Sequence, residues 1–580
     1  MDNDFDNALS APPADASVMP TRRQLLAALS AAGIGTVAFR RAVAQTVRQS
    51  GGIDEESIRN AEWVAGIELS EEERKTAAAS VQGVLRKCEQ MRAVAVGYDT
   101  VPAIRFDPEM FDAEVCIRAN QCPKCLSPSD PVVPDKPGLS EHLSFRSIRE
   151  LGTALRSGDV SAVQLTRYCL DGLTQCDPVL KCVVTLTEDL AMRQAEQADR
   201  ELAAGQDRGP LHGIPWGAKD LIAVADYPTT WGAPQFTKRV IEQTATVAQK
   251  LEHAGAVLVA KLSLGALAMG DRWFGGQTRN PWNPEQGSSG SSAGSASAVA
   301  AGLVPFALGS ETLGSIVSPS RRCGIAALRP TFGRVSRQGC MALSWTMDKI
   351  GPLARNIDDC GLVFDAIHGA DSGDPTSVER WFQWPMQVDL RQLKIGRVEG
   401  VPLATADQKI LGILEEQGAN IIPVSLPDEF PEWAVSLMLD AEAATIFHDL
   451  VATKNTDGLN RWPEIFRKMH FMTAVDYLHA SRLRSRLMQK MSDVFRLVDL
   501  YIGGGDLGIC NLTGHPTVVI PAVMAGDGET RQPACGTLTG RLHDEATLLA
   551  AARLVESHTG VPGQNVPGIN AVKSHESPGN

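Results

Sequence analysis

Several features are missing from this 580-residue sequence, and each absence removes a class of protein. The chain has no apolar run of about 18 residues or more, so no membrane-spanning helix is expected. It has no basic surplus: the net charge is −13, which argues against nonspecific nucleic-acid binding. No internal repeat is visible, and no second C-x-x-C stands at the spacing of a zinc site. We therefore expect no nucleic-acid partner, no stable membrane insertion, no metal and no cofactor.

The first 44 residues have the pattern of an export signal rather than of a folded segment. Arg22 and Arg23 form a twin-arginine pair, a moderately apolar stretch follows from Leu25 to Phe39, and Ala42-Val43-Ala44 is an A-x-A cleavage site. This order predicts a Tat-type signal and a periplasmic or other extracytoplasmic location. The alternatives are an unprocessed tail of a cytoplasmic protein and a mitochondrial-like presequence, because Arg40 and Arg41 lie close before the cleavage site.

Export would change the expected state of the twelve cysteines. Cys122 and Cys125 form a C-x-x-C motif, with Cys116 six residues ahead, and an oxidising compartment would allow a disulfide there. A thioredoxin-like motif would need a βαβ context, whereas a proline-rich stretch follows the second cysteine. Structural cysteines are the favoured interpretation.

The rest of the chain divides into four parts. Residues 45–94 are expected to be helical, with helices over 53–67 and 70–91 and Ser70 as an N-cap before three glutamates. Residues 95–142 form an extended, proline-bearing connector, residues 143–560 form the main domain, and the Gly- and Pro-rich residues 561–580 are expected to be disordered.

Helical and strand patterns alternate through the main domain, which predicts an α/β fold. Residues 246–262 indicate a helix that leads into a strand, and residues 393–424 indicate a βαβ-like passage. We expect the middle region, 381–496, to shape a substrate pocket. Its segment 462–487 is helical and amphipathic in pattern, which fits packing as well as recognition.

The most informative stretch is Gly287–Thr331, GSSGSSAGSASAVAAGLVPFALGSETLGSIVSPSRRCGIAALRPT. Two serine- and glycine-bearing clusters flank an apolar, small-residue run, so we expect two hydroxyl-rich turns at the ends of one buried element. Such turns suit a nucleophile and a helper group. A Gly/Ser linker is the alternative, but a linker does not continue into a long stretch of core-grade sequence.

The same stretch resembles the amidase signature family, whose pattern runs roughly G-G-S-S-G-G-S-A-x-A-V-A-A-G-x-x-P-x-A-x-G-x-D-x-G-G-S-I-R. Counting from VAAG places the family's double serine on Ser291 and Ser292 and its nucleophile on Ser315. Upstream, GIPWGAKDLI places the family's lysine on Lys219. Further similar segments are FGGQTRNPWNP, NLTGHPTVVIPA and GRLHDEATLLAAARLVE, so the resemblance spans residues 143–555.

The resemblance implies a mixed central β-sheet covered by helices on both sides, with an N-terminal helical extension. It also implies that Ser315 attacks the substrate, Ser291 bridges, Lys219 acts as base and then as acid, and Ser292 supports the loop. Because a serine hydroxyl needs a base and a lysine is a base only when neutral, burial must lower the pKa of Lys219 from about 10.4.

The oxyanion site implied by the family consists of backbone N–H groups in the turn Thr312, Leu313, Gly314 and Ser315. Here the sequence departs from the family pattern. Leu313 replaces a glycine, which requires a negative φ at that residue, and Val317 replaces an arginine near the nucleophile. Ser289 and Ala293 also replace glycines, and Glu311 replaces the usual aspartate.

A second motif overlaps the first serine cluster. Residues 290–294 read as G-x-S-x-G, the nucleophile elbow of α/β hydrolases, with Ser292 at its tip. That elbow needs a strand before the serine and a helix after it. The preceding RNPWNPEQ contains two prolines and indicates a turn instead of an apolar strand, so the elbow is disfavoured.

Three functions are therefore compared. The leading one is an exported amide hydrolase that cleaves linear C–N bonds other than peptide bonds, with a small-molecule amide as its partner and a homodimer left open. The second is the glutaminase subunit of a tRNA-dependent amidotransferase, because residues 45–94 resemble the small C subunit of that complex. The predicted export and Val317 oppose it. The third is a catalytically impaired binding protein, which the retention of Lys219, Ser291 and Ser315 opposes.

Overall fold

The computed structural model describes residues 53–65, 67–78, 80–81, 105–111, 121–129, 143–470, 472–503, 505–527 and 531–561. They belong to two compact units, one within residues 1–96 and one within residues 97–580. The predicted export signal, Cys116, most of the connector and residues 562–580 lie outside the described residues.

The first unit contains helix α3 (Glu55–Ala65) and a second helix that begins at residue 71. Ser70 caps this second helix, because its hydroxyl oxygen accepts the N–H of Glu73 at 3.4 Å, which confirms the predicted N-cap. The N–H and hydroxyl of Ser70 in turn donate to Glu73 Oε2 over 2.7 Å. Arg74 joins the two helices through an ion pair with Glu62 at 2.6 Å. The part of the predicted second helix after residue 81 lies outside the described residues.

The second unit is built on an 11-stranded mixed β-sheet. In order across the sheet the strands are β14 (Asn420–Val424), β13 (Lys394–Val398), β15 (Leu500–Ile502), β17 (Gln532–Gly540), β16 (Thr517–Ala525), β10 (Ala326–Arg329), β11 (Lys349–Ala354), β9 (Phe306–Glu311), β3 (Pro215–Lys219), β4 (Val257–Leu262) and β2 (Val183–Leu186). Strands β9, β3 and β4 are parallel neighbours near one edge, while β10, β11, β16 and β17 pair antiparallel. Small additional strands are β1 (Leu126–Pro128), β12 (Met386–Val388), β5 (Arg272–Trp273), β6 (Gly276–Gln277), β7 (Arg279–Asn280) and β8 (Asn283–Gly287).

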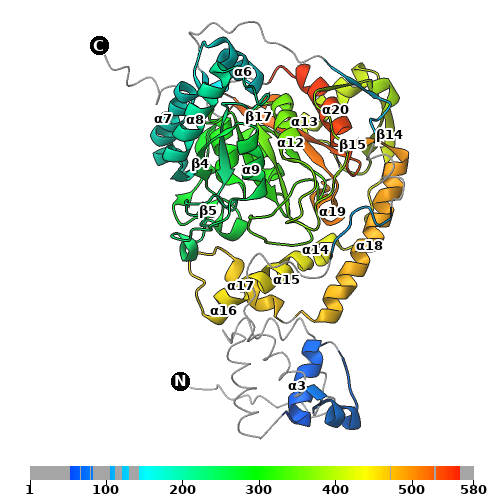
Figure 1. The fold of residues 1–580 in the computed structure, drawn as a ribbon. Helices are drawn as coiled ribbons and strands as arrows, with labels where there is room; N and C mark the ends of the chain where they lie inside the picture. The colour runs from blue at the N-terminus through cyan, green and yellow to red at the C-terminus, as the bar shows by residue number, and fades with distance from the viewer. Residues whose placement is uncertain are drawn as a thin grey trace, which may run out of the picture. The chain divides into compact units, whose positions relative to one another are not determined.

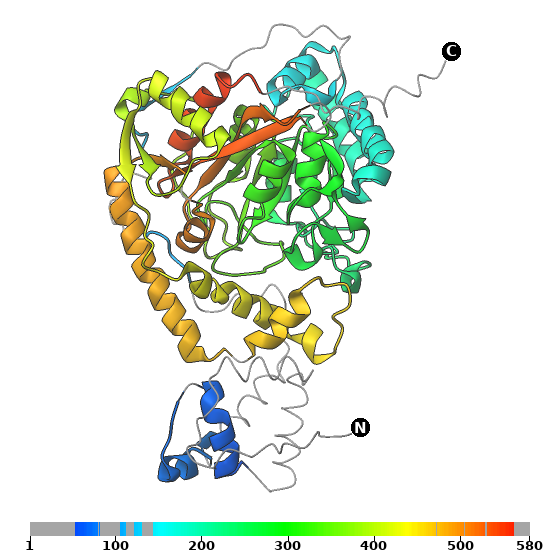
Figure 2. The ribbon, with the colours of Figure 1, turned by 180° about the vertical axis from the view of Figure 1, so that it is seen from behind.

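Helices flank this sheet, as Figures 1 and 2 show from opposite sides. They are α6 (Ile148–Ser157), α7 (Ala162–Leu180), α8 (Glu188–Ala203), α9 (Thr246–His253), α10 (Ala293–Ala300), α11 (Val317–Cys323), α12 (Ile357–Ile367), α13 (Thr405–Glu416), α19 (Leu507–Thr513) and α20 (Glu545–Ser557). The chain between β14 and β15 forms α14 (Glu432–Val435), α15 (Leu437–Ile446), α16 (His448–Ala452), α17 (Trp462–Met469) and α18 (Ala474–Leu497). The predicted α/β fold is confirmed.

Several local predictions are also confirmed. Helix α9 leads into β4, and β13, α13 and β14 form the expected βαβ passage with parallel strands. The amphipathic segment 462–487 is divided between α17 and α18, because Thr473 starts a new helix by accepting the N–H of Asp476 on its hydroxyl.

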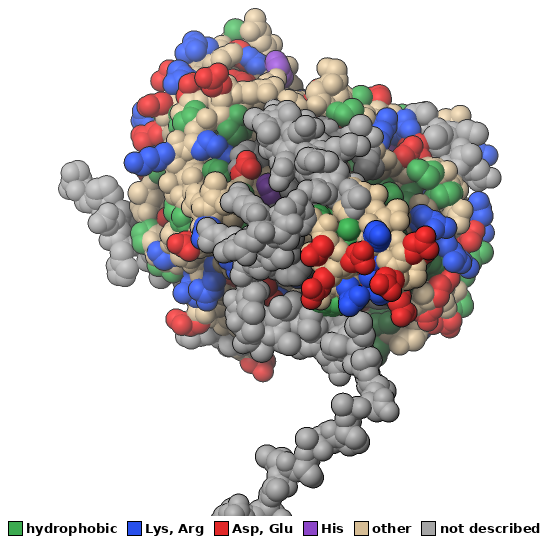
Figure 3. Space-filling view, turned by 90° about the horizontal axis from the view of Figure 1, so that it is seen from below, with side chains coloured by type: hydrophobic (Ala, Val, Ile, Leu, Met, Phe, Trp, Pro, Cys, Tyr) green, Lys and Arg blue, Asp and Glu red, His purple; other side chains and the backbone are tan. Residues whose placement is uncertain are grey.

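None of the helices in the described ranges is both long and apolar enough to cross a membrane. On the face drawn in Figure 3, described acidic and basic side chains are interspersed.

The serine tract folds differently from the prediction of one buried element with a turn at each end. It forms helix α10, reverses direction and returns as the interior strand β9. Gly302 makes the reversal possible because its φ is +67° and a Cβ there would lie 2.8 Å from the carbonyl oxygen of Ser144. Consequently both serine clusters lie at the same end of the hairpin, where Ser310 N donates to Ser292 Oγ over 3.1 Å.

Candidate active site

Lys219 lies at the carboxyl end of β3, in the interior of the sheet, and its side chain is fully buried. Its neighbour β9 is parallel to it, so the residues that end both strands meet at the same edge of the sheet. Lys219 Nζ lies within hydrogen-bond distance of Ser291 Oγ at 2.8 Å, Ser292 Oγ at 3.1 Å and Ser310 Oγ at 2.9 Å. It also donates to the carbonyl oxygen of Ser310 at 3.2 Å.

The surroundings of Lys219 favour its neutral form. Burial lowers the pKa of Lys219 to about 7, while the carboxylates of Asp348 and Glu311 act in the opposite direction. All four of these partners are hydroxyl or carbonyl oxygens, and none is a carboxylate. The predicted lowering of the pKa of Lys219 by burial is therefore present, and it favours the free base near neutral pH.

The first serine cluster precedes α10 and is buried: Ser291 is 1% exposed and Ser292 is 0% exposed. The peptide bond between Gly290 and Ser291 is cis. Ser292 fastens the two clusters together, because its hydroxyl donates to the carbonyl oxygen of Ser310 and accepts the N–H of the same residue, both over 3.1 Å. This arrangement fits the supporting role expected for Ser292.

Ser310, a direct partner of Lys219, is a site residue that the sequence motifs did not single out. The signal for it was its place in the second hydroxyl-bearing cluster, GSETLGS, immediately before Glu311. Its residue type alone does not distinguish it from the other buried serines of the tract. Only the parallel pairing of β3 with β9 places it against the lysine.

Ser315 lies in the turn between β9 and α11 and is 9% exposed. Its carbonyl oxygen accepts the N–H of Ser292 over 3.0 Å, which joins this turn to the first serine cluster. Within the described ranges, the N–H groups of Leu313, Gly314 and Ser315 donate to no protein acceptor. Three adjacent donors beside a serine hydroxyl are the type of site that stabilises an oxyanion.

The turn accommodates Leu313 without strain. The positive φ that a turn of this kind needs falls on Gly314, at +84°, and Leu313 is not among the residues with a positive φ. The condition that the sequence set for Leu313 is thus met. Of the other replaced glycines, Ala293 is the first residue of α10 and needs no special conformation, whereas Ser289 adopts φ +61°.

Glu311 connects the residues after Ser315 to the protein core, because its carboxylate accepts four hydrogen bonds. One carboxylate oxygen accepts the N–H groups of Ile316 and Val317 at 2.8 and 2.9 Å. The other accepts Arg329 Nη1 at 2.9 Å and Asn511 Nδ2 at 2.8 Å. Although burial acts to raise it, the positive charges of Arg329 and Lys349 hold the pKa of Glu311 at about 2. Glu311 therefore remains ionised and fixes the two residues that follow Ser315.

Asp348 holds the other side of the turn. One of its oxygens accepts the hydroxyl of Thr312 at 2.6 Å, and the other accepts the N–H groups of Leu343 and Ser344 at 2.8 and 2.9 Å. Burial raises the pKa of this carboxyl group. Neither Asp348 nor Arg329 was predicted, because both lie outside the serine tract's two clusters and only the tertiary fold brings them to it.

The α/β-hydrolase elbow does not fit this geometry. A short strand, β8, does precede the first serine cluster, contrary to the sequence prediction, but it pairs only with β7 outside the main sheet. Ser292, the residue at the tip of such an elbow, is fully buried, and its hydroxyl is hydrogen-bonded to Ser310 and Lys219. A nucleophile elbow instead exposes its serine at the top of the sheet.

The disulfide that an oxidising compartment would allow is not formed between the two cysteines of the C-x-x-C motif, and Cys116 lies outside the described residues. Cys122 and Cys125 are both free thiols. Cys122 is exposed and donates to the carbonyl oxygen of Pro123 at 3.6 Å, whereas Cys125 Sγ lies 4.0 Å from Thr547 Oγ1. The two side chains thus have different surroundings. Within the described residues, no cluster of three or more His, Cys, Asp or Glu side chains is arranged to hold a metal ion.

A family model and curated proteins match the part of the chain that contains this site. The family described as Amidase matches residues 164–504, a range that includes Lys219 and both serine turns. A glutamyl-tRNA(Gln) amidotransferase subunit from Chloroflexus aurantiacus is 34% identical over 473 residues, covering 70% of this chain and 96% of that protein. The corresponding protein from Coxiella burnetii is 30% identical and covers 71% of this chain and 97% of its own.

Solved structures of other proteins also superpose on most of this chain. The native peptide amidase of Stenotrophomonas maltophilia superposes with a TM-score of 0.64 at 27% identity, covering 72% of this chain and 98% of its own. A protein described as part of a vestigial complex that reveals the origins of an s-triazine catabolic enzyme superposes with a TM-score of 0.65 at 26% identity. That match covers 73% of this chain and 100% of the other.

Proposed function

Because the chain belongs to the amidase signature family, whose chemistry is the hydrolysis of amide C–N bonds, we propose that it converts a carboxamide into a carboxylate and ammonia or an amine through an acyl ester on Ser315. The observation that carries this proposal is the hydrogen bond of 2.8 Å between Lys219 Nζ and Ser291 Oγ in a fully buried setting. It links a lysine of lowered pKa to the serine cluster that is bound to the Ser315 turn.

Acylation begins with neutral Lys219. Ser315 Oγ attacks the carbonyl carbon, its proton passes to Ser291 Oγ, and the proton of Ser291 passes to Lys219 Nζ. The negative charge that develops on the substrate oxygen is stabilised by the N–H groups of the turn. The lysine then returns a proton through Ser291 to the substrate nitrogen, the C–N bond breaks, and ammonia or an amine leaves.

Deacylation repeats the sequence with water as the nucleophile. Water gives a proton through Ser291 to Lys219 and attacks the ester carbonyl. The C–O bond to Ser315 breaks, the proton returns to Ser315 Oγ, and the carboxylic acid is released. The lysine is thus base and acid in turn, which is the role that a histidine has in a Ser-His-Asp triad.

A glutaminase component of an amidotransferase is the second candidate. The relatives from Chloroflexus aurantiacus and Coxiella burnetii are named as parts of such an enzyme, and the capped helix pair of the first unit supports the resemblance to a C subunit. One feature of the site opposes it. Glutamine has a charged backbone end, and Val317, where the family pattern has arginine, supplies no positive charge beside the nucleophile.

The two candidates differ in their need for a partner and in their preferred amide. We expect the purified chain alone to hydrolyse simple linear amides and the Ser315→Ala variant to be inactive with all of them. The assay measures ammonia release from aryl amides, fatty amides, amino-acid amides and glutamine. Activity restricted to glutamine, or activity that requires the other components of an amidotransferase, would favour the second candidate.

We further propose that residues 1–44 export the protein. The support is the twin-arginine pair, the apolar stretch and the A-x-A site in that order. Residues 1–50 fused to a reporter are expected to direct Tat-dependent export, and Arg22→Lys with Arg23→Lys is expected to stop it. A reporter retained in the cytoplasm in both cases would contradict export and strengthen the amidotransferase candidate.

A further inference from the structure

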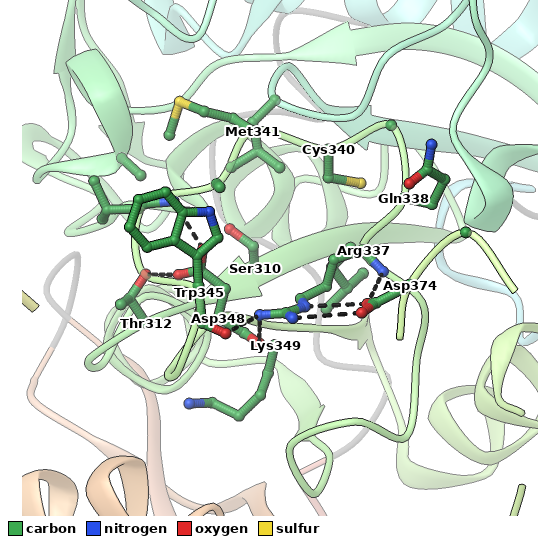
Figure 4. Close-up of a pocket in the computed structure, with 17 residues that line it drawn as sticks. Ser310, Thr312, Arg337, Gln338, Cys340, Met341, Trp345, Asp348, Lys349 and Asp374 are labelled. Carbon is green, nitrogen blue, oxygen red and sulfur yellow. Dashed lines mark hydrogen bonds and ion pairs between the residues drawn. The ribbon is translucent and has the colours of Figure 1, made fainter. Parts of the chain in front are cut away.

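A pocket lies at the carboxyl end of β9, where Ser310 binds Lys219, and Figure 4 shows its lining. Ser310, which binds Lys219, and Thr312, in the proposed oxyanion turn, form one wall. Most of the remaining lining surface is apolar and includes Leu221, Ala268, Met341, Leu343, Trp345 and Ile350. Its polar and charged side chains are Arg337, Gln338, Asp348, Lys349 and Asp374. The pocket has about 60 Å³ of internal space, which is a volume for a short group rather than for a long chain.

Each charged side chain of this pocket already forms a hydrogen bond or an ion pair with another protein group. Arg337 forms an ion pair with Asp374 at 3.2 Å and donates to the carbonyl oxygen of Trp345 at 2.8 Å. Asp348 accepts three hydrogen bonds from the protein. Lys349 donates to the carbonyl oxygen of Met347, and Figure 4 shows its amine turned away from Trp345. Of the two lining cations, both within the described range 221–374, Arg337 is paired with a carboxylate and Lys349 is directed away from Trp345, so neither faces the indole side of the pocket.

One polar group of the pocket is not satisfied. Trp345 Nε1 is buried, and among the lining residues, all of them described, it is the only buried side-chain nitrogen or oxygen without a hydrogen-bond partner. Figure 4 shows the nitrogen edge of the indole turned toward Ser310 and the interior of the pocket. A buried donor without a partner costs about 1–3 kcal/mol, so native proteins rarely keep one without a reason.

We infer that this pocket holds the acyl part of the substrate and that Trp345 selects short, uncharged acyl groups that carry a hydrogen-bond acceptor. The inference rests on the proposed function and adds a substrate class to it. The indole N–H donates to an ether, carbonyl or hydroxyl oxygen in the acyl chain, while the apolar wall contacts its carbon atoms. A charged acyl chain meets only charged side chains that already bind protein groups, and it loses its hydration in the pocket.

Two pairs of amides of equal shape test the donor. Methoxyacetamide and butanamide differ by an oxygen in place of a methylene group, and 3-methoxypropanamide and pentanamide repeat the exchange one atom further along. Trp345→Phe keeps an aromatic ring and removes the N–H. We expect it to lower kcat/KM for the ether of one pair about two- to tenfold, the value of one net hydrogen bond, and to change its methylene counterpart less than about twofold.

The change in the ether-to-methylene ratio is the decisive quantity, since the intrinsic reactivities of the two amides cancel in it. An unchanged ratio in both pairs would overturn the inference. Trp345→Leu, which also lacks the donor, provides the same test if Trp345→Phe does not fold. Glutamine and succinamic acid, with charged acyl groups, should react at least about tenfold less efficiently than butanamide, and comparable rates would also overturn it.

Binding to the Ser315→Ala variant separates this inference from the proposed function. Calorimetry with the same four amides, with and without Trp345→Phe, measures the pocket in the absence of any reaction. A loss of ether preference there supports the role of Trp345 even if no amide is hydrolysed by the wild type. Hydrolysis by the wild type with no effect of Trp345 in either assay would leave the proposed function standing and refute the inference.

Discussion

Two buried cationic side chains, Lys219 and Arg329, bind adjacent residues at the carboxyl end of β9, and they differ in what surrounds them. Lys219 is bound by hydroxyl and carbonyl oxygens only, whereas Arg329 forms an ion pair of 2.9 Å with Glu311. Both cations are almost completely excluded from solvent. Burial therefore acts on both, and the difference between them arises from their partners.

The difference separates the group that moves a proton from the group that holds the turn. Without a carboxylate in contact, Lys219 has its pKa lowered to about 7 and can lose a proton. The pair of Glu311 and Arg329 stays charged: the pKa of Glu311 is about 2, and the nearby carboxylate raises the pKa of Arg329 against the effect of burial. A chain that needs both functions in one site must keep the ion pair out of contact with the base.

Lys219→Met tests the lysine side of this comparison and should have the largest effect on activity. The side chain keeps a similar length but becomes apolar, so folding should be retained in this buried position while the proton acceptor is lost. We expect kcat to fall by about 10²–10⁴ or more, the range for a general base, with the thermal unfolding midpoint near that of the wild type. Activity within about tenfold of the wild type would remove Lys219 from the mechanism.

Glu311→Gln tests the ion-pair side. It leaves the buried guanidinium of Arg329 without its counter-charge, so we expect the free energy of unfolding to decrease by about 3–5 kcal/mol. Glu311→Asp is the matched control, because it keeps the charge but shortens the reach to the N–H groups of Ile316 and Val317. Denaturant unfolding measures both variants. Equal stability of the Gln variant and the wild type would show that the pair is not needed.

The pH dependence of kcat/KM tests the charge state of Lys219. The reaction requires the neutral amine, and the pKa of Lys219 is about 7. The rate should therefore rise about tenfold per pH unit well below pH 7 and reach a plateau above it. Initial rates from about two pH units below this pKa to about two above it, with an uncharged amide, measure this profile. A rate that decreases as pH rises through 7 would contradict a free-base lysine.

Ser292→Ala should have the smallest effect of the single changes. The hydroxyl joins the two serine clusters through Ser310, and the loss of one such hydrogen bond costs about 0.5–1.5 kcal/mol. We expect kcat/KM to decrease about tenfold or less. Ser291→Ala should cost clearly more, because Ser291 carries the proton between Ser315 and Lys219. The reverse order of the two variants would exchange their roles.

Much of the fold could be predicted from the sequence. The alternation of helical and strand patterns indicated the α/β class, and the pairing of β13 with β14 followed from one βαβ pattern. The serine tract was harder, because an apolar run of small residues fits one long element as well as a helix followed by a strand. Gly302, which turns the chain with φ +67°, was the residue that decided it.

Part of the candidate site could also be predicted from the sequence, and part could not. Lys219, Ser291, Ser292 and Ser315 were named from ordered motifs, and the structure brings the first three into direct contact. Ser310, Asp348 and Arg329 were not found, since their contacts depend on which strands are neighbours and on long-range turns. The role of Trp345 also could not be predicted, because an unpaired N–H is visible only once every neighbouring acceptor has been placed.

Covalent labelling with a fluorophosphonate tests the central claim most directly. If Ser315 is the nucleophile, mass spectrometry of digested, labelled protein should find the adduct on Ser315 and on no other residue. Ser315→Ala should lose labelling and hydrolysis together, and Ser291→Ala should be labelled more slowly at the same site. An adduct on Ser292, or labelling that persists in the Ser315→Ala variant, would contradict the account.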